Sequence, residues 1–349
     1  MNFTAPQEKS ITFKLIDDAP GVGRAGQTVT MALSPQDTYI TGEIETYLGG
    51  YAQQSDFRAD QVSPPILVDK ETGSYRNFTK VNTFKRVNVN TSLQGAINEV
   101  DPETELKSYT AEHRALGCFI PAITASQSVF DPMLAGAKRI REAMDLDREI
   151  RLWAVLTLAG NWAAANKVTL GAGFEWADPV GANSDPLGDL SRRRQGSAAR
   201  ITDWWMNQEI ADAYIRHPAV RAHMLQMLGH NAPSPQIVAA AEDFAIPGVG
   251  NIHVVAAKVL NETTLNLDSI LNDTIVGTHG IPGVPRTGED MATVNTFRVK
   301  GPSGTGWQIR QVFLDVRGYA GGTMLIAGHQ EAIVMASDSI GGVVYDVSQ

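Results

Sequence analysis

The chain of 349 residues has 43% hydrophobic residues and a net charge of −9, which is typical of a globular protein with a large core. This acidity argues against a protein whose affinity comes from neutralising nucleic-acid phosphates, although it does not exclude a container for DNA. Apolar stretches fall short of the roughly 20 residues that a membrane helix needs, and residues 1–10 lack a secretory signal, so we expect a soluble cytoplasmic product with no membrane contact.

The first third of the chain favours extended structure. Residues 1–60, with glycine-rich punctuation, are expected to form an N-terminal arm, and residues 61–115 an extended β-hairpin. The predicted strands are Ile66–Val68, Val81–Val89 and Leu106–Ile120. Both alternating faces of Leu106–Leu116 mix polar and apolar side chains, so we expect neither face to be buried within this chain. A hairpin at about Ile66–Glu112 would then lie across a neighbouring molecule.

A long helix is predicted to begin at Asp131-Pro132, because aspartate accepts hydrogen bonds from free N–H groups and proline suits the first helical position. Apolar residues follow at helical spacing with charged residues between them: Met133, Ala137, Ile140, Met144, Leu146, Ile150, Trp153 and Thr157. We expect this helix to run to about residue 165, a length of roughly 50 Å, and to form a spine that crosses the whole subunit.

Shorter elements follow a second helix start at Asp185-Pro186. The predicted helices are Asp189–Arg200, Asn207–Arg216, Pro218–Leu228 and Pro235–Phe244. The predicted strands are Asn251–Val259, Thr293–Lys300, Gln308–Val316, Thr323–Ile326 and Ala332–Ala336. Because strands and helices do not alternate strictly, an α+β fold is favoured over a doubly wound parallel sheet.

One motif matches a nucleotide-binding pattern in letters. Gly21–Gly26 fits the dinucleotide fingerprint G-x-G-x-x-G, which must open a helix directed at the pyrophosphate. The following run, Gln27–Met31, is instead of β type, and Pro20 interrupts the expected junction between strand and glycines. We therefore interpret the motif as a glycine-rich bend and expect no nucleotide and no other cofactor.

The residues of catalytic and metal sites do not occur in recognised patterns. The seven histidines are His113, His217, His223, His230, His253, His279 and His329, and no spacing among them is typical of a metal site. No G-x-S-x-G elbow occurs, and the single cysteine, Cys118, lies in an apolar run and is given a structural role. We expect no catalytic, cofactor-binding or metal residues, while a site assembled from dispersed carboxylates stays open as an alternative.

Two further clusters have two interpretations each. Arg192, Arg193 and Arg194, with Arg200, either contact DNA or a neighbour's carboxylates, or form a solvated helix face, which we favour. The run Trp204–Met206 either anchors an interface or packs in the core.

Several segments occur in an order that is typical of one family. They are Tyr109–Pro121, the helix start at Asp131-Pro132, Met144–Glu149, the connection through Trp176 to Asp185-Pro186, Tyr214–Pro218 and Ser234–Lys258. Through these segments the sequence from Tyr109 to the end resembles the major capsid proteins of tailed bacteriophages, whose Hong Kong fold is shared with encapsulins.

The resemblance implies a division into four parts. These are an N-terminal arm at residues 1–60, an extended loop at 61–115, a peripheral domain at 116–180 and 300–349 with the spine helix at about 131–165, and an axial domain at 181–299.

The implied function is that of a structural subunit of an icosahedral phage head, with no enzymatic activity. Copies would self-assemble into pentamers and hexamers around packaged double-stranded DNA, after synthesis in the host bacterial cytoplasm. Scaffold, portal and decoration proteins would be further partners, and contact with DNA would be non-specific. The alternatives are an encapsulin-like nanocompartment shell and, more distantly, an enzyme with a dispersed site.

Overall fold

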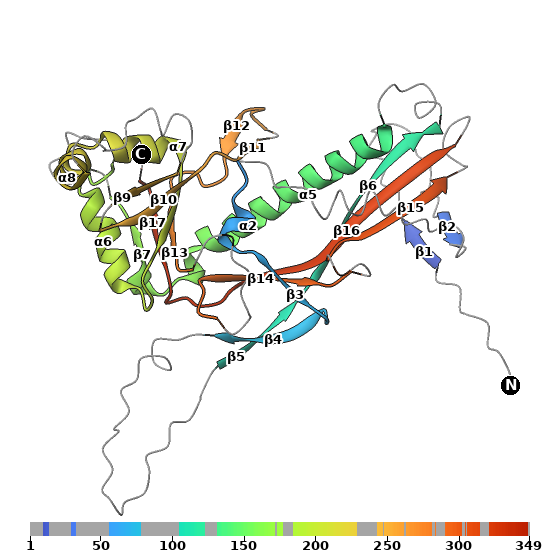
Figure 1. Ribbon diagram of the computed structural model, residues 1–349, viewed down its shortest axis with the longest axis horizontal. Coiled ribbons are helices and arrows are strands. Elements are labelled where there is room, and N and C mark those ends of the chain that lie inside the picture. The colour runs from blue at the N-terminus through green and yellow to red at the C-terminus, as the bar shows by residue number, and fades with distance from the viewer. Residues whose placement is uncertain are drawn as a thin grey trace, which may run out of the picture. The chain divides into compact units, whose positions relative to one another are not determined.

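The computed structural model gives the chain an α+β architecture, as predicted (Figure 1). The described residues are 10–13 and 29–32, both as backbone, then 56–77, 105–122, 131–171, 173–176, 184–228, 243–246, 248–261, 263–280, 283, 290–301, 304, 306–314 and 321–347.

Contacts divide the chain into two compact units. Unit 1 comprises Met1–Gly50, Ala115–Ile140 and Trp307–Gly328. Unit 2 comprises Tyr51–Arg114, Arg141–Gly306 and His329–Gln349. The four-part division implied by the resemblance is a finer statement and stays a prediction.

A six-stranded sheet forms the centre of unit 2. Its order is β7 (Lys167–Thr169), β17 (Gly342–Tyr345), β13 (Ile275–Thr278), β8 (Asp203–Asn207), β10 (Gly250–Val255) and β9 (Phe244–Ile246). Every residue of β8 is buried. Successive side chains of a strand point to opposite faces, so Trp204 packs in one apolar cluster with Tyr214 while Trp205 packs in another with Trp153. The tryptophan pair is therefore core and not an exposed anchor.

Three helices of unit 2 follow local signals closely. These are α6 (Pro186–Gly196), α7 (Gln208–Arg216) and α8 (Pro218–Leu228). Asn207 caps α7 by accepting a hydrogen bond from the Ile210 N–H at 2.7 Å, and the predictions for α7 and α8 are confirmed.

Two other helix predictions have different outcomes. The helix predicted at Asp189–Arg200 instead begins at Pro186, where Asp185 accepts from the Gly188 N–H at 3.0 Å, and ends at Gly196. A further helix was predicted at Pro235–Phe244. Its residues 235–242 lie outside the described residues, and Phe244 itself begins strand β9.

The long helix α5 (Pro132–Thr157) begins where the sequence predicted, with Asp131 Oδ1 accepting from the Met133 N–H at 2.8 Å. It ends at Thr157 and not near residue 165. Asn161 Nδ2 donates to Val155 O at 2.8 Å, and Trp162 Nε1 donates to Leu156 O at 2.7 Å. These side chains satisfy two carbonyls of the last turn, which lack partners within the helix itself.

The predicted apolar stripe of α5 is only partly correct. Ala137, Ile140, Met144 and Trp153 are buried, but Ile150 is 37% exposed. Charged residues take buried positions on α5 instead: Arg141, Asp145, Arg148 and Glu149.

A second sheet contains β15 (Gln308–Leu314), β16 (Gly322–Met335), β14 (Val294–Val299) and β3 (Pro65–Val68), with β6 (Glu112–Pro121) also paired to β16. Strand β16 is continuous, whereas the sequence predicted two strands, Thr323–Ile326 and Ala332–Ala336. The ladder with β15 reaches Gly328 and the ladder with β14 begins at Glu331, so two residues, His329 and Gln330, lie between the two ladders within one strand.

The base of a hairpin lies where one was predicted. Strands β4 (Thr72–Asn77) and β5 (Glu105–Thr110) pair in antiparallel register from Thr72↔Thr110 to Asn77↔Glu105. The strand predicted at Val81–Val89 lies outside the described residues.

The burial of this hairpin base differs from the prediction. Tyr109 is 7% exposed and stacks on Phe297 of β14, with ring centroids 4.2 Å apart, and Tyr75 packs on the same ring. Hence one face of the base is buried against its own chain, while Leu106 is 65% exposed.

The remaining elements are β1 (Ser10–Phe13), β2 (Val29–Ala32), α2 (Ala59–Val62), β11 (Lys258–Leu260) and β12 (Leu267–Ser269). Among the described residues, no helix combines the length and apolarity that crossing a membrane requires.

Candidate functional site

A buried network of charges joins α5 to strands β14 and β16. Arg148 Nε donates to Glu331 Oε1 at 3.1 Å, and Arg298 Nη2 donates to Glu331 Oε2 at 2.6 Å. Arg148 also pairs with Asp60 of α2 and donates to the Ser63 carbonyl oxygen at 2.7 Å. One arginine on the helix thus holds two other segments of unit 2, α2 with its C-terminal end and β16.

The protonation states in this network follow from its charges. Burial alone would raise the pKa of Glu331, but the arginines Arg148 and Arg298 outweigh it and hold that pKa well below its usual range. Burial, aided by the charge of Arg298, lowers the pKa of His329 to about 3, so this imidazole is neutral. Glu331 pairs with Arg148 of α5 and with Arg298 of β14, so the network acts as a structural clamp between these elements and β16.

Glu149 provides a second buried attachment of α5. Its carboxylate accepts from the backbone N–H groups of Arg58 and Ala59 and, at 2.7 Å, from Trp153 Nε1. Burial raises the pKa of Glu149, while these hydrogen bonds oppose the shift. The segment Met144–Glu149, noted in the sequence for its family resemblance, thus supplies several of the charged contacts of the helix.

His253 lies between two carboxylates. Its Nε2 is 2.9 Å from Asp203 Oδ1 and its Nδ1 is 2.9 Å from Asp243 Oδ2, while the ring stacks on Trp205 at 4.3 Å. Burial alone would lower the pKa of His253, but the hydrogen bonds to the two carboxylates outweigh it and raise that pKa. Arg58 pairs with Asp243 at 2.9 Å.

This arrangement does not suit catalysis. A general base or metal ligand needs a ring nitrogen with a free lone pair, and both nitrogens of His253 face carboxylate oxygens. No local sequence pattern indicates this arrangement, because Asp203 lies 50 residues away from His253 along the chain. Among the described residues, no group of three or more histidine, cysteine, aspartate or glutamate residues is placed to hold a metal ion.

The other described histidines are dispersed. His113 lies near Gln330 of β16, His279 Nδ1 is 2.7 Å from the Arg200 carbonyl oxygen, and burial lowers the pKa of His217 at the end of α7. His230 lies outside the described residues.

The arginine cluster on α6 is engaged with its own chain. Arg192 pairs with Asp185 at 3.1 Å, Arg193 donates to the Ala165 carbonyl oxygen at 2.8 Å, and Arg194 donates to the carbonyl of Gly248. These contacts favour the interpretation of a helix face over that of a DNA contact.

Two sequence features concern the first unit. The fingerprint Gly21–Gly26 lies outside the described residues, but the segment after it contains strand β2 and not a helix. Cys118 is half-buried, and its Sγ lies 3.3 Å from where a Cβ on Gly136 of α5 would be. This close approach fits the structural role predicted for the cysteine.

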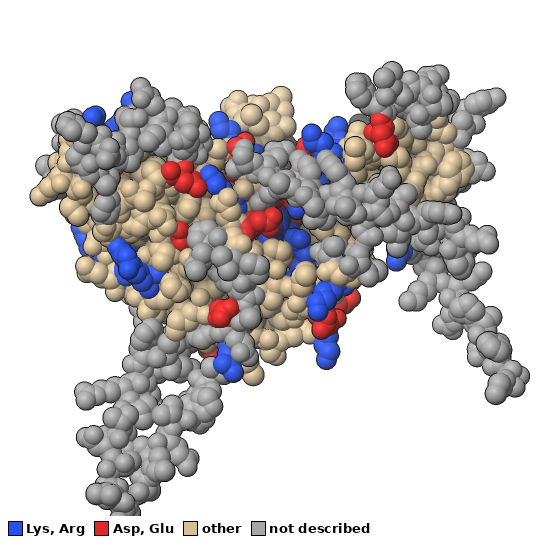
Figure 2. Space-filling view, in the orientation of Figure 1, with Lys and Arg blue, Asp and Glu red and all other residues tan. Residues whose placement is uncertain are grey.

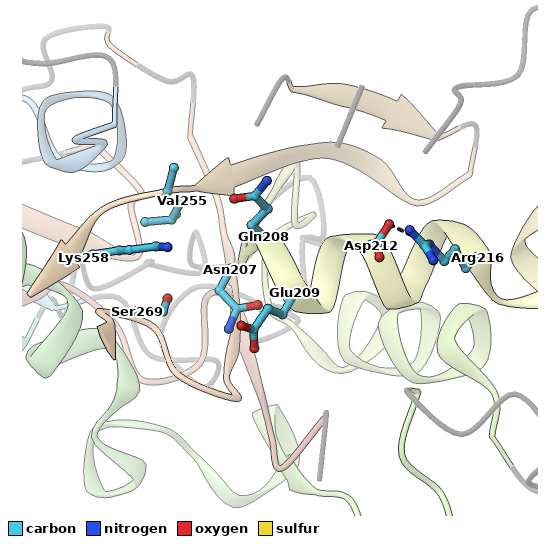
Figure 3. Close-up of a pocket in the computed structure, with 9 residues that line it drawn as sticks. Asn207, Gln208, Glu209, Asp212, Arg216, Val255, Lys258 and Ser269 are labelled. Atoms are coloured by element: carbon cyan, nitrogen blue, oxygen red, sulfur yellow. Dashed lines mark hydrogen bonds and ion pairs between the residues drawn. The ribbon is translucent and has the colours of Figure 1, made fainter. Parts of the chain in front are cut away.

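A pocket of about 300 Å³ lies at the start of α7 (Figure 3). Its lining residues are Asn207, Gln208, Glu209, Asp212, Arg216, Val255, Ala256, Lys258 and Ser269. Asp212 and Arg216 pair at 2.8 Å, and the remaining charges, Glu209 and Lys258, are opposite in sign. The pocket thus has balanced charge. Its hydroxyl group, Ser269 Oγ, is buried and makes no hydrogen bond among the described residues, so no base is placed to activate it.

The surface of the described residues also carries large apolar side chains that are exposed to solvent. Those more than half exposed are Leu106, Leu158, Leu225, Met227, Leu260, Leu265, Leu267 and Phe313. Such residues mark contact surfaces when they gather on projecting elements.

The comparisons with known proteins point to one architecture. No family model and no curated protein matches the sequence. A phage-related protein from Bordetella bronchiseptica is similar in structure, with a TM-score of 0.67, 15% identity, and coverage of 89% of this chain and 98% of that one.

Two capsids are similar as well. The capsid of the cyanophage P-SCSP1u has a TM-score of 0.53 at 9% identity and covers 85% of this chain and 89% of its own. The capsid of the native GTA particle has a TM-score of 0.53 at 12% identity, with coverage of 84% and 91%. The chain therefore has the phage capsid fold, and the predicted fold is confirmed.

Proposed function

We propose that this protein is a structural subunit of an icosahedral phage head, which self-assembles into pentamers and hexamers around packaged double-stranded DNA. The observation that carries the proposal is the capsid fold, which extends over 84–89% of the chain in the similar structures. At these identities the likeness concerns the fold alone, so the function depends on the surfaces of this chain as well.

The hairpin base supports an assembly role. Tyr75 and Tyr109 attach it to Phe297, while Leu106 on the neighbouring part of β5 stays exposed. A two-stranded ribbon is marginally stable alone in water, so a partner surface would stabilise whatever extends beyond this base. A neighbouring subunit is the partner that a closed shell supplies, because each copy of a shell protein contacts several others through different surfaces.

The proposal includes the four-part division given above, with an N-terminal arm, an extended loop, a peripheral domain and an axial domain. It also includes a location in the virion capsid after synthesis in the host bacterial cytoplasm. Scaffold, portal and decoration proteins are the proposed further partners, and the net charge of −9 favours weak, non-specific contact with DNA.

We infer a non-enzymatic role from the chemistry of the polar clusters. The charged groups at Glu331 are buried in ion pairs, both nitrogens of His253 are engaged, and the pocket at α7 has no nucleophile paired with a base. Each cluster has a structural explanation in the contacts that it makes.

The test is electron microscopy and sedimentation of the purified full chain. The proposal expects closed shells, or pentamers and hexamers that become shells as concentration rises. A monodisperse monomer at every salt and protein concentration would contradict it. Shells that enclose a protein cargo, with a gene for a cargo enzyme beside this one in place of portal and terminase genes, would favour the encapsulin-like alternative.

A further inference from the structure

His253 of β10 lies between two carboxylates that come from the two neighbouring strands of the six-stranded sheet. Asp203 belongs to β8, and Asp243 directly precedes β9, the strand at the edge of the sheet (Figure 1). Each ring nitrogen lies 2.9 Å from a carboxylate oxygen. A neutral imidazole carries one N–H group, whereas an imidazolium carries two. The ring can therefore donate to both carboxylates at once when it is protonated, and to one of them when it is neutral.

The two carboxylates differ in how firmly they are held. The side chain of Asp203 is 2% exposed, and it also accepts from Thr202 Oγ1 and Asn251 Nδ2. The side chain of Asp243 is 37% exposed, so water can solvate it when it turns away from the ring. A buried carboxylate that loses a donor costs more free energy than an exposed one. A neutral His253 should therefore keep its N–H on Asp203 and present a lone pair to Asp243.

Asp243 connects the edge of the sheet to a third segment. Its Oδ1 accepts from the Val254 N–H at 3.3 Å and from Arg58 Nη2 at 2.9 Å. Arg58 precedes α2, and its own backbone N–H donates to Glu149 of α5. Strand β9 is three residues long and pairs with β10 through three residues. Because so short a ladder provides few hydrogen bonds, the side chain of Asp243 contributes substantially to fixing the start of β9.

The surroundings of the ring favour its protonated form. Burial alone would lower the pKa of His253, but the hydrogen bonds to Asp203 and Asp243 outweigh it and raise that pKa. Figure 2 shows acidic and basic side chains interspersed among the described residues of the visible face, without a large patch of one sign. The nearest carboxylates therefore set the charge of the ring, and its titration falls above the ordinary histidine pKa of about 6.5.

We propose that His253 is a pH-operated latch for the edge strand β9. The protonated ring holds Asp243 against the sheet. When the ring loses its proton to solvent, Asp243 turns out into water, and the start of β9 loosens together with the contact to Arg58. The latch is closed below the ordinary histidine pKa and opens as the pH rises through the raised value. The inference goes beyond the proposed function, because it describes a switch within one subunit and holds whether or not the subunit forms a shell.

The test is electron paramagnetic resonance of a nitroxide on the edge strand. Ala245 of β9 is exposed, so Ala245→Cys in a full-length chain that carries Cys118→Ser gives one labelling site. From about pH 6 to about pH 9, the nitroxide should become more mobile as His253 loses its proton. A nitroxide at Leu158→Cys, in the same Cys118→Ser background, should keep its mobility, because Leu158 is 57% exposed and follows the end of α5.

Two variants should fix the latch in opposite states. His253→Gln has one donating nitrogen that does not titrate, so the nitroxide should be mobile at both pH values. Asp243→Asn places an NH₂ group where Oδ2 faces the ring, so it can donate to a neutral imidazole while Oδ1 keeps Arg58 and Val254. In that variant the nitroxide should stay immobile at about pH 9. His279→Gln is the matched control, because His279 contacts a backbone carbonyl oxygen and its loss should leave the transition unchanged.

Circular dichroism checks that each labelled chain is folded, and the labelled parent chain tests the latch even if a variant does not fold. Absence of a pH transition in the parent chain, or an unchanged transition in His253→Gln, would overturn the proposal. A mobile nitroxide at about pH 9 in Asp243→Asn would do so as well, since the strand would then open without a lone pair facing a carboxylate. The same transition at Leu158→Cys would show general loosening of the fold, and its loss in His279→Gln would assign the titration to the wrong histidine.

Discussion

Arg148 and Glu331 lie 183 residues apart in the chain, yet their side chains meet at 3.1 Å in the buried region between α5 and β16. Arg298 approaches the same carboxylate from β14, so one glutamate compensates two buried arginines. Loss of Glu331 would leave both buried arginines without the charge that compensates them here, although Arg148 keeps its pair with Asp60.

Glu331→Gln should therefore be strongly destabilising. It keeps the shape of the side chain but removes the charge that Arg148 and Arg298 share, so we expect a loss of about 3–5 kcal/mol in the free energy of unfolding. Urea unfolding followed by circular dichroism measures this loss. The matched control is Asp212→Asn, which breaks the exposed ion pair with Arg216 and should cost about 0.5 kcal/mol or less. Equal losses for the two variants would contradict the clamp.

His253 should make stability depend on pH in a defined direction. The folded state raises the pKa of His253, so it binds the proton more tightly than the unfolded chain does. The stabilisation is fully present below the ordinary histidine pKa and is lost as the pH rises through the raised value. The neighbours Asp203 and Asp243 have lowered pKa values and stay ionised across this window.

The measurement compares wild-type protein with His253→Gln. The difference in unfolding free energy between them should be larger at about pH 5.5 than at about pH 9. Arg58, the remaining charged group beside Asp243, is present in both proteins. A difference that is the same at both pH values would show that His253 contributes only by packing on Trp205.

The two faces of α5 should respond differently to charge. Ile140 is 4% exposed, so Ile140→Asp buries an unpaired carboxylate and should cost about 3 kcal/mol or more, enough to reduce soluble folded protein. Lys138 is exposed, and Lys138→Glu should leave folding intact with a change of about 1 kcal/mol or less. Soluble yield and thermal melting measure both variants, and identical behaviour would remove the assignment of a buried face.

Shortening the hairpin should separate folding from assembly. The segment to replace is residues 78–104. A longer replacement starting at Gly73 would also remove Tyr75 and its contact with Phe297. A short Gly/Ser turn can join Asn77 to Glu105, because these residues are paired across the ribbon. We expect an unchanged circular dichroism spectrum and thermal melt, together with loss of shells in electron microscopy. Normal shells from this variant would rule out an intersubunit role for the segment.

Local signals in the sequence were enough to predict the helices whose first residues are set by a capping side chain or a proline beside them. Asp131-Pro132 marks the start of α5, and Asn207 and Pro218 mark the starts of α7 and α8, because caps and proline act on the backbone beside them. The order of such elements was also sufficient for the family resemblance and the fold that it implied.

Tertiary structure decided which charges and aromatic residues are buried. From the sequence alone Arg148 is expected on a solvated helix face, but in the fold it is buried against Glu331, a residue of a distant strand that also pairs with Arg298. Trp204 and Trp205 are both core because β8 is covered on each face. Gly328 stays within one strand because β15 pairs there, although glycine alone indicates a turn. Burial and hydrogen bonding depend on partners far away in the chain, and a pattern read along the sequence contains only near neighbours.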